Sequence, residues 1–128
     1  MLRLVYIATG GAIGAVARYS VSGWVQNFGQ GTFPWGTLFV NTAGSLLIGL
    51  FFGLSELTSV SPAARLFFAV GFLGAFTTFS TYSLETLNLL RDKETMLAFV
   101  NIGLNNLLTL AFVFGGYLLS RYVVTFLK

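Results

Sequence analysis

Four apolar stretches, each close to the length needed to cross a bilayer, constrain this chain more than any other feature. They run approximately over Leu4–Val25, Gly36–Leu57, Arg65–Leu90 and Thr95–Tyr122. A spanning helix needs roughly 20 mainly apolar residues, because the hydrocarbon core of a bilayer is about 30 Å thick. The connections between the stretches are short, so neighbouring helices must run antiparallel. We therefore expect an all-α integral membrane protein with a single four-helix transmembrane domain over residues 1–128.

The composition agrees with exposure to lipid and removes most enzyme chemistry. Hydrophobic residues make up 55% of the chain and charged residues only 9%, whereas about 25% charged residues is usual in a soluble domain. Cysteine and histidine are both absent, which excludes thiol chemistry, imidazole metal ligands and the most common general base. We expect a protein that is not an enzyme, that lies in a lipid bilayer and that has no nucleic-acid partner.

Lysine and arginine are almost evenly divided between the two sides of the membrane that four spans would define. One side would carry Arg3, Arg65, Arg121 and Lys128, and the other would carry Arg18, Arg91 and Lys93. Asymmetry in these residues sets the direction in which a membrane protein inserts, so a balance of four against three favours insertion in both directions. Two opposite copies could then pair, and we expect a symmetric antiparallel homodimer.

Polar residues recur at helical spacing in two of the apolar segments. The second segment carries Thr37, Asn41 and Ser45, and the fourth carries Asn101, Asn105 and Thr109. Residues four apart share a helix face, and polar groups inside a membrane face a partner helix or a water-filled path. Hydrogen bonds that only hold helices together, worth roughly 0.6 to 2 kcal/mol each, are the simpler explanation of one stripe. The presence of two stripes favours a polar path.

The third segment contains the run GAFTTFSTYS over residues 74–83. Glycine and hydroxyl residues are poor choices for the interior of a continuous helix, so we expect the helix to break here. Main-chain groups freed by a break are tolerated only where they are buried or line a cavity, and they can bind ions. Phe79 and Tyr82 would share a helix face, where a ring edge could meet an anion, although core packing also explains either residue.

Three ordered motifs resemble the signatures of the Fluc (CrcB) family of small fluoride channels. They are GGAIGAVARY (10–19), GTLFVNTAG (36–44) and GFLGAFTTFSTYSLE (71–85). The resemblance spans essentially the whole chain, and it implies an antiparallel, dual-topology homodimer with two fluoride pores and a structural sodium ion at its centre. It also implies a multi-pass protein of the bacterial inner (plasma) membrane. Such a channel would export fluoride passively, down its electrochemical gradient.

The resemblance further implies roles for individual residues. Gly74 and Thr77 would supply backbone carbonyls to the sodium ion from both subunits. Phe79 would be the first aromatic residue of the pore. Tyr82 stands where the family has a second phenylalanine, which leaves open whether its ring edge or its hydroxyl meets the ion. The other implied positions are Asn41 as the pore asparagine, Arg18 as the first-helix arginine, Glu85 as the acidic residue after the third motif, and Asn105 and Thr109 as polar pore groups.

Uncharged hydrogen-bond donors suit a small, strongly hydrated anion. Such an ion gives up water only where donors replace it, and amide and hydroxyl groups donate without a permanent charge that would hold the ion too tightly. The candidate donors are Asn41, Thr78, Ser80, Thr81, Asn105 and Thr109. For Arg18 two roles stay open, namely raising the anion concentration at a pore mouth and pairing with the C-terminus of a helix.

Two other classes of function are alternatives to a fluoride channel. A small proton-coupled multidrug exporter needs a titratable group in mid-membrane, and Glu85, near the end of the third segment, is the one candidate in the sequence. A noncatalytic assembly subunit would use both polar stripes only to pack against a larger partner. Neither explains a hydroxyl cluster beside two aromatic residues, so passive fluoride conduction is the predicted function.

Overall fold

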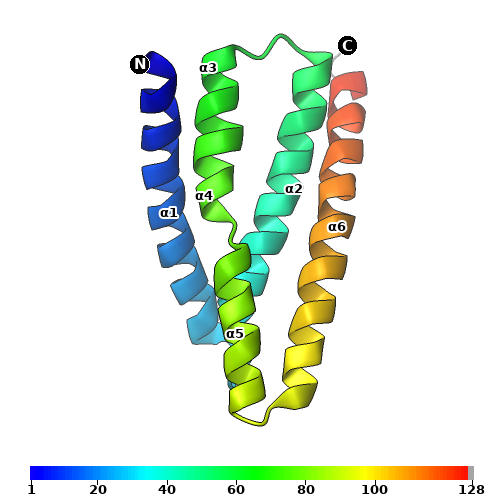
Figure 1. The fold of residues 1–128 in the computed structure, drawn as a ribbon. Helices are drawn as coiled ribbons and strands as arrows, with labels where there is room; N and C mark the ends of the chain where they lie inside the picture. Colours follow the sequence, from blue (N-terminus) through cyan, green and yellow to red (C-terminus); the bar gives the residue numbers. More distant parts are fainter. Residues whose placement is uncertain (127–128) are drawn as a thin grey trace.

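The computed structural model describes residues 1–126 and is all-helical, with four long apolar helical spans. They are α1 (Leu2–Phe28), α2 (Trp35–Leu57), a composite third span over Pro62–Arg91, and α6 (Thr95–Phe126). Each is long and apolar enough to cross a membrane, which confirms the four predicted segments and is consistent with a membrane protein. Figure 1 shows the start of α1, the end of α6 and the α2–α3 connection on one side, and the other two connections on the opposite side.

The third span is built from several pieces instead of one continuous helix. Its pieces are α3 (Pro62–Ala64), the π-helix η1 (Arg65–Leu73), α4 (Gly74–Phe76) and α5 (Phe79–Arg91). Between α4 and α5 the backbone is extended, since Thr77 has ψ 155° and Thr78 has φ −150° and ψ 120°. The predicted break in the third helix is therefore seen as a bend at Thr77–Thr78, visible at the centre of Figure 1.

Glycines let α2 and α6 pack with their backbones close together. A Cβ atom on Gly49 of α2 would lie 2.1 Å from the carbonyl oxygen of Val113, and one on Gly116 of α6 would lie 2.1 Å from that of Leu46. Real Cβ contacts are never this short, so neither position can carry a larger residue without separating the helices. Small residues at such contacts are the usual means by which membrane helices approach one another.

Close contacts at glycines also join α1 to the first half of the third span. A Cβ atom on Gly10 would lie 2.3 Å from the carbonyl oxygen of Phe67, and one on Gly14 would lie 2.2 Å from that of Phe72. The second half of the span packs elsewhere, because α5 lies against α6 while η1 and α4 lie against α1. The bend at Thr77–Thr78 thus separates two halves that have different neighbours.

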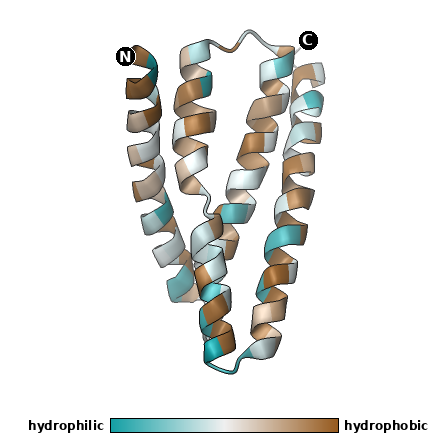
Figure 2. Cartoon of the chain, in the orientation of Figure 1, coloured by the Kyte–Doolittle hydropathy of each residue, from teal (hydrophilic) through white to brown (hydrophobic). Residues whose placement is uncertain are grey.

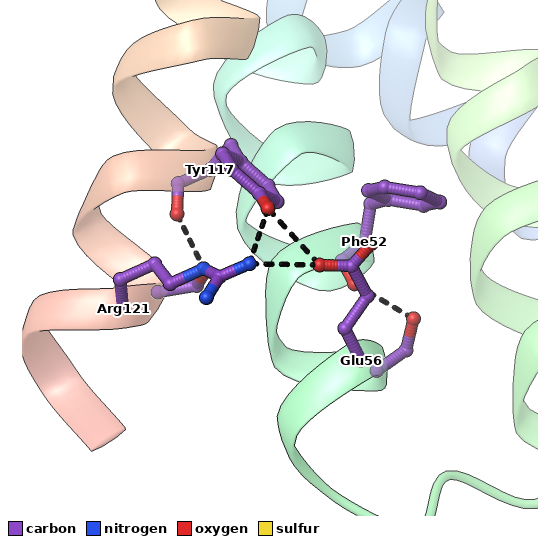
Figure 3. Close-up of polar contacts among 6 residues, drawn as sticks. Phe52, Glu56, Tyr117 and Arg121 are labelled. Carbon is purple, nitrogen blue, oxygen red and sulfur yellow. Dashed lines mark hydrogen bonds and ion pairs between the residues drawn. The ribbon is translucent and has the colours of Figure 1, made fainter. Parts of the chain in front are cut away.

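A small polar cluster joins α2 and α6 at one end of their contact (Figure 3). Glu56 Oε2 accepts a hydrogen bond from the Tyr117 hydroxyl at 3.1 Å and lies 3.3 Å from Nη2 of Arg121. Arg121 Nη2 also donates to the Tyr117 hydroxyl oxygen at 2.5 Å. The ion pair is about half exposed, and such pairs contribute little on their own, so the glycine contacts carry most of the α2–α6 attachment.

The close contact at Gly116 predicts the effect of a substitution on stability, and the neighbouring residue Gly115 provides a matched control. Gly116→Ala should destabilise the folded protein by about 1–3 kcal/mol, the usual cost of overpacking, because its new methyl group meets the Leu46 carbonyl. Gly115→Ala adds the same methyl group to the same helix, where no atom lies within 4 Å. Unfolding of both variants in detergent, followed by circular dichroism, measures the difference, and equal stability of the two would contradict the packing described here.

Candidate functional site

The bend in the third span frees main-chain groups that a continuous helix would pair. In an α-helix the carbonyl of Gly74 would accept from the N–H of Thr78, and that of Thr77 from the N–H of Thr81. Instead, the Thr78 N–H donates to Asn41 Oδ1 at 2.8 Å, and the Thr81 N–H donates to Thr78 Oγ1 at 3.2 Å. The carbonyls of Gly74 and Thr77 therefore lose their helical donors.

Asn41 of α2 supports the bend. Its Oδ1 accepts from the Thr78 N–H, and its Nδ2 donates to the Thr78 carbonyl at 3.0 Å. One buried side-chain amide thus pairs with both main-chain groups of one residue. An unpaired main-chain group in hydrocarbon costs several kcal/mol, so Asn41 supplies partners without which the extended backbone at Thr78 would be strongly unfavourable.

A chain of side-chain hydrogen bonds continues from Asn41 through α6 to α5. Asn41 Nδ2 also donates to Asn105 Oδ1 at 3.0 Å, and Asn105 Nδ2 donates to Asn101 Oδ1 at 2.8 Å. Asn101 Nδ2 then donates to the hydroxyl oxygen of Thr86 at 2.9 Å, and that hydroxyl donates to the Tyr82 carbonyl at 2.8 Å. The amides of the two predicted polar stripes therefore bond to each other.

Both ends of this hydrogen-bonded chain determine its direction. At one end the Tyr82 carbonyl can only accept, so the Thr86 hydroxyl donates to it and accepts from Asn101. At the other end the Thr78 N–H can only donate, so Asn41 presents its oxygen there. Both ends require the same direction of donation along the chain. Exchanging the oxygen and nitrogen positions of any one amide would place two donors or two acceptors next to each other. The chain therefore holds its amides in a single orientation.

A cavity of about 330 Å³ lies beside the bend, between α2, the third span and α6. The predicted site residues in its wall are Asn41, Gly74, Thr77, Thr78, Phe79, Tyr82, Asn105 and Thr109. Figure 2 shows hydrophilic residues on α2 and α6 at the level of the bend, within helices that are otherwise largely hydrophobic. The structure thus brings most of the predicted residues together around one space.

Two predicted hydroxyl donors lie outside the cavity wall. Thr81 Oγ1 accepts a hydrogen bond from Thr78 Oγ1 at 3.0 Å. Ser80 is exposed on the first turn of α5, with its Oγ 3.4 Å from Thr78 Oγ1. Both residues therefore belong to the N-terminal cap of α5, where Thr78 is the capping residue.

The two charged candidates bind other parts of the chain instead of lining the cavity. Arg18 Nε donates to the carbonyl of Ala75 at 3.0 Å, so of its two possible roles the structure shows pairing with a helix C-terminus, that of α4. Glu85 Oε1 accepts from the Thr37 hydroxyl at 2.7 Å. The other carboxylate oxygen of Glu85 is buried and has no hydrogen-bond partner within residues 1–126.

An aromatic pair forms the α5 side of the cavity. The rings of Phe79 and Tyr82 lie edge to face, with centroids 5.2 Å apart, so the two residues share a helix face as their spacing of three predicts. Phe79 is 75% exposed in the single chain, whereas Tyr82 is only 7% exposed. The Tyr82 hydroxyl accepts a hydrogen bond from Nδ2 of Asn106 at 3.3 Å. Sequence reasoning did not select Asn106, although an amide directly after Asn105 in an apolar segment was a usable signal.

Main-chain oxygens are the candidate metal ligands of this site. Within residues 1–126 no group of three or more acidic side chains could hold a metal ion. The carbonyls of Gly74 and Thr77 have lost their helical donors, and both residues line the cavity. Unwound backbone carbonyls of this kind coordinate sodium in other membrane proteins, so the donor set fits a hard monovalent cation.

Comparison with known proteins identifies the family to which this chain is similar. Residues 5–117 match the family model described as CrcB-like protein, Camphor Resistance (CrcB). The fluoride-specific ion channel FluC of Shewanella amazonensis is 51% identical over 117 residues, which cover 91% of this chain and 94% of that protein. The protein of the same name from Thermococcus kodakarensis is 47% identical over 116 residues, covering 90% and 93%. That from Geotalea daltonii is 43% identical over 124 residues, covering 96% and 100%.

These matches extend over nearly the whole length of the chain and include the bend in the third span, its supporting asparagine and the residues of the cavity wall. The chain therefore belongs to the CrcB family.

Proposed function

We propose that this protein is a fluoride-selective channel that exports fluoride passively, down its electrochemical gradient. The observation that carries the proposal is its similarity, over nearly the whole chain, to proteins named fluoride-specific ion channel. The cavity beside the bend supports it, because the residues in its wall are uncharged and include several hydroxyls and amides. Neutral groups can replace the hydration of an ion without holding it too tightly to leave. The bacterial inner membrane is the location that suits this activity.

The channel is an antiparallel homodimer with two pores in this proposal. The near balance of lysine and arginine between the two sides favours insertion in both directions. In addition, Ser80, Ser83 and Asn106 are exposed on the single chain close to the bend, where polar groups are costly in lipid. A second copy, crossing the first near the bend, would cover these groups and the exposed ring of Phe79.

A structural sodium ion at the dimer centre is the third part of the proposal. Gly74 and Thr77 of each copy would hold it through the carbonyls that the bend frees from helical hydrogen bonding. A bound cation would offset part of the cost of bringing an anion into a medium of low dielectric constant.

The side chains that line the cavity would have different roles in conduction. Phe79 would present its ring edge to the ion, and Tyr82 would meet the ion through its ring edge or its hydroxyl. Asn41 and Asn105 would shape the wall and hold the bend, because both hydrogens of each amide are already bonded within the chain. Thr109 donates its hydroxyl to the Asn105 carbonyl at 2.6 Å and so presents its oxygen and methyl group.

Fluoride efflux from liposomes that contain only this polypeptide tests the proposal directly. We expect efflux that follows the fluoride gradient and the membrane potential and that persists when the proton gradient is collapsed. Chloride-loaded liposomes provide the control for leak. A requirement for a proton gradient would contradict passive conduction, and the absence of fluoride efflux would contradict the channel itself.

Replacing Phe79 with isoleucine tests the role of the ring edge. Phe79→Ile keeps an apolar side chain but removes the aromatic ring, so fluoride flux should fall at least about tenfold, equivalent to a barrier increase of roughly 1.4 kcal/mol. Phe28→Ile is the matched control, because Phe28 is 72% exposed and lies outside the cavity. Wild-type flux from a correctly assembled Phe79→Ile protein would mean that this ring only packs.

The dimer proposal predicts that both orientations occur in the membrane. With four lysines and arginines on one side and three on the other, tagged copies should show C-termini on both faces of the membrane. Labelling of a C-terminal tag by a reagent that cannot cross the membrane, before and after permeabilisation, measures the two populations. A single orientation for all copies would rule out the antiparallel arrangement.

A further inference from the structure

We propose that the hydroxyl of Tyr82, held in place by Asn106, is an anion-binding donor of the cavity. This inference rests on the proposed function only for the identity of the anion, which is fluoride. It assigns a binding role to the phenolic O–H group of Tyr82 and a positioning role to Asn106.

The hydrogen bond between the two side chains leaves the phenolic hydrogen free. Asn106 uses one Nδ2 hydrogen on the Ile102 carbonyl at 2.8 Å and the other on the Tyr82 hydroxyl oxygen at 3.3 Å. A hydroxyl that accepts one hydrogen bond can still donate another. Within residues 1–126 no protein group accepts from the Tyr82 hydroxyl, and Tyr82 and Asn106 both line the cavity.

Most other donors of the cavity wall are already engaged within the chain. The hydroxyls of Thr77, Thr78 and Thr109 donate to Leu73 O, Thr81 Oγ1 and Asn105 O, and the amides of Asn41 and Asn105 belong to the hydrogen-bonded chain described above. Ser45 and Tyr82 carry the wall hydroxyls that donate to no acceptor in the described residues. Of these two, the Tyr82 hydroxyl also accepts a hydrogen bond, which strengthens it as a donor.

The surroundings of the hydroxyl suit an anion. Tyr82 is 7% exposed, so its hydroxyl acts at a site of low dielectric constant, where hydrogen bonds to a charged acceptor are strong. The Phe79 ring lies edge to face with the Tyr82 ring and adds an aromatic neighbour.

Fluoride titration of the purified protein, followed by the ultraviolet difference spectrum of tyrosine, tests the inference without measuring transport. We expect a saturable spectral change in the wild type and its loss in Tyr82→Phe. Tyr19→Phe is the matched control, because Tyr19 is 82% exposed and outside the cavity, and it should keep the full change. A wild-type spectrum that does not respond to fluoride, or a response that survives in Tyr82→Phe, overturns the inference.

A double-mutant cycle tests the positioning role of Asn106. Removing a hydrogen bond to a charged group should lower fluoride affinity roughly tenfold or more in Tyr82→Phe, with a smaller loss in Asn106→Leu. In the Tyr82→Phe background, Asn106→Leu should cause no further loss of affinity, measured by calorimetry on variants with wild-type helicity. Equal losses in both backgrounds would show that Asn106 acts independently of Tyr82.

The two proposals fail in different ways. Fluoride flux without a Tyr82-dependent spectral change would overturn this inference and leave the channel intact. A Tyr82-dependent change without flux would support the binding site and contradict the channel.

Discussion

The main chain of a bent span cannot be left unpaired in hydrocarbon, and the rest of this structure depends on how that condition is met. The backbone at Thr78 leaves the helix, and Asn41 takes both of its polar groups. That arrangement frees the carbonyls of Gly74 and Thr77 from helical hydrogen bonds, and both residues line the cavity between the helices. One asparagine on a neighbouring helix therefore makes the break compatible with a membrane.

The packing around the bend divides the helices into two groups. Close glycine contacts attach α2 to α6, and these two helices carry Asn41, Asn101 and Asn105. The first half of the third span belongs to α1, while α5 belongs to α6. The cavity lies where these two groups meet, so its shape depends on contacts made by both.

Much of the fold and part of the site could be predicted from sequence. Segment length and apolar character predicted the four spans, and the GAFTTFSTYS run predicted the break, because both depend on local properties. The spacing of Asn101 and Asn105 predicted a shared face, but spacing does not say which helix that face meets. The direct bond from Asn41 to Asn105, the pairing of Arg18 with Ala75 and the contact of Asn106 with Tyr82 depend on tertiary packing. The π-helix η1 likewise has no local signal that we recognised.

The position of Asn41 along the chain has a consequence for how the protein is made. Asn41 precedes Thr78 by 37 residues, and Asn105 follows Asn41 by 64. Because a chain is synthesised from its N-terminus, α2 is made before the bend and α6 is made after it. Asn41 is therefore available to pair with the extended residue Thr78 before Asn105 is made. The later helix α6 then completes the chain of amide hydrogen bonds.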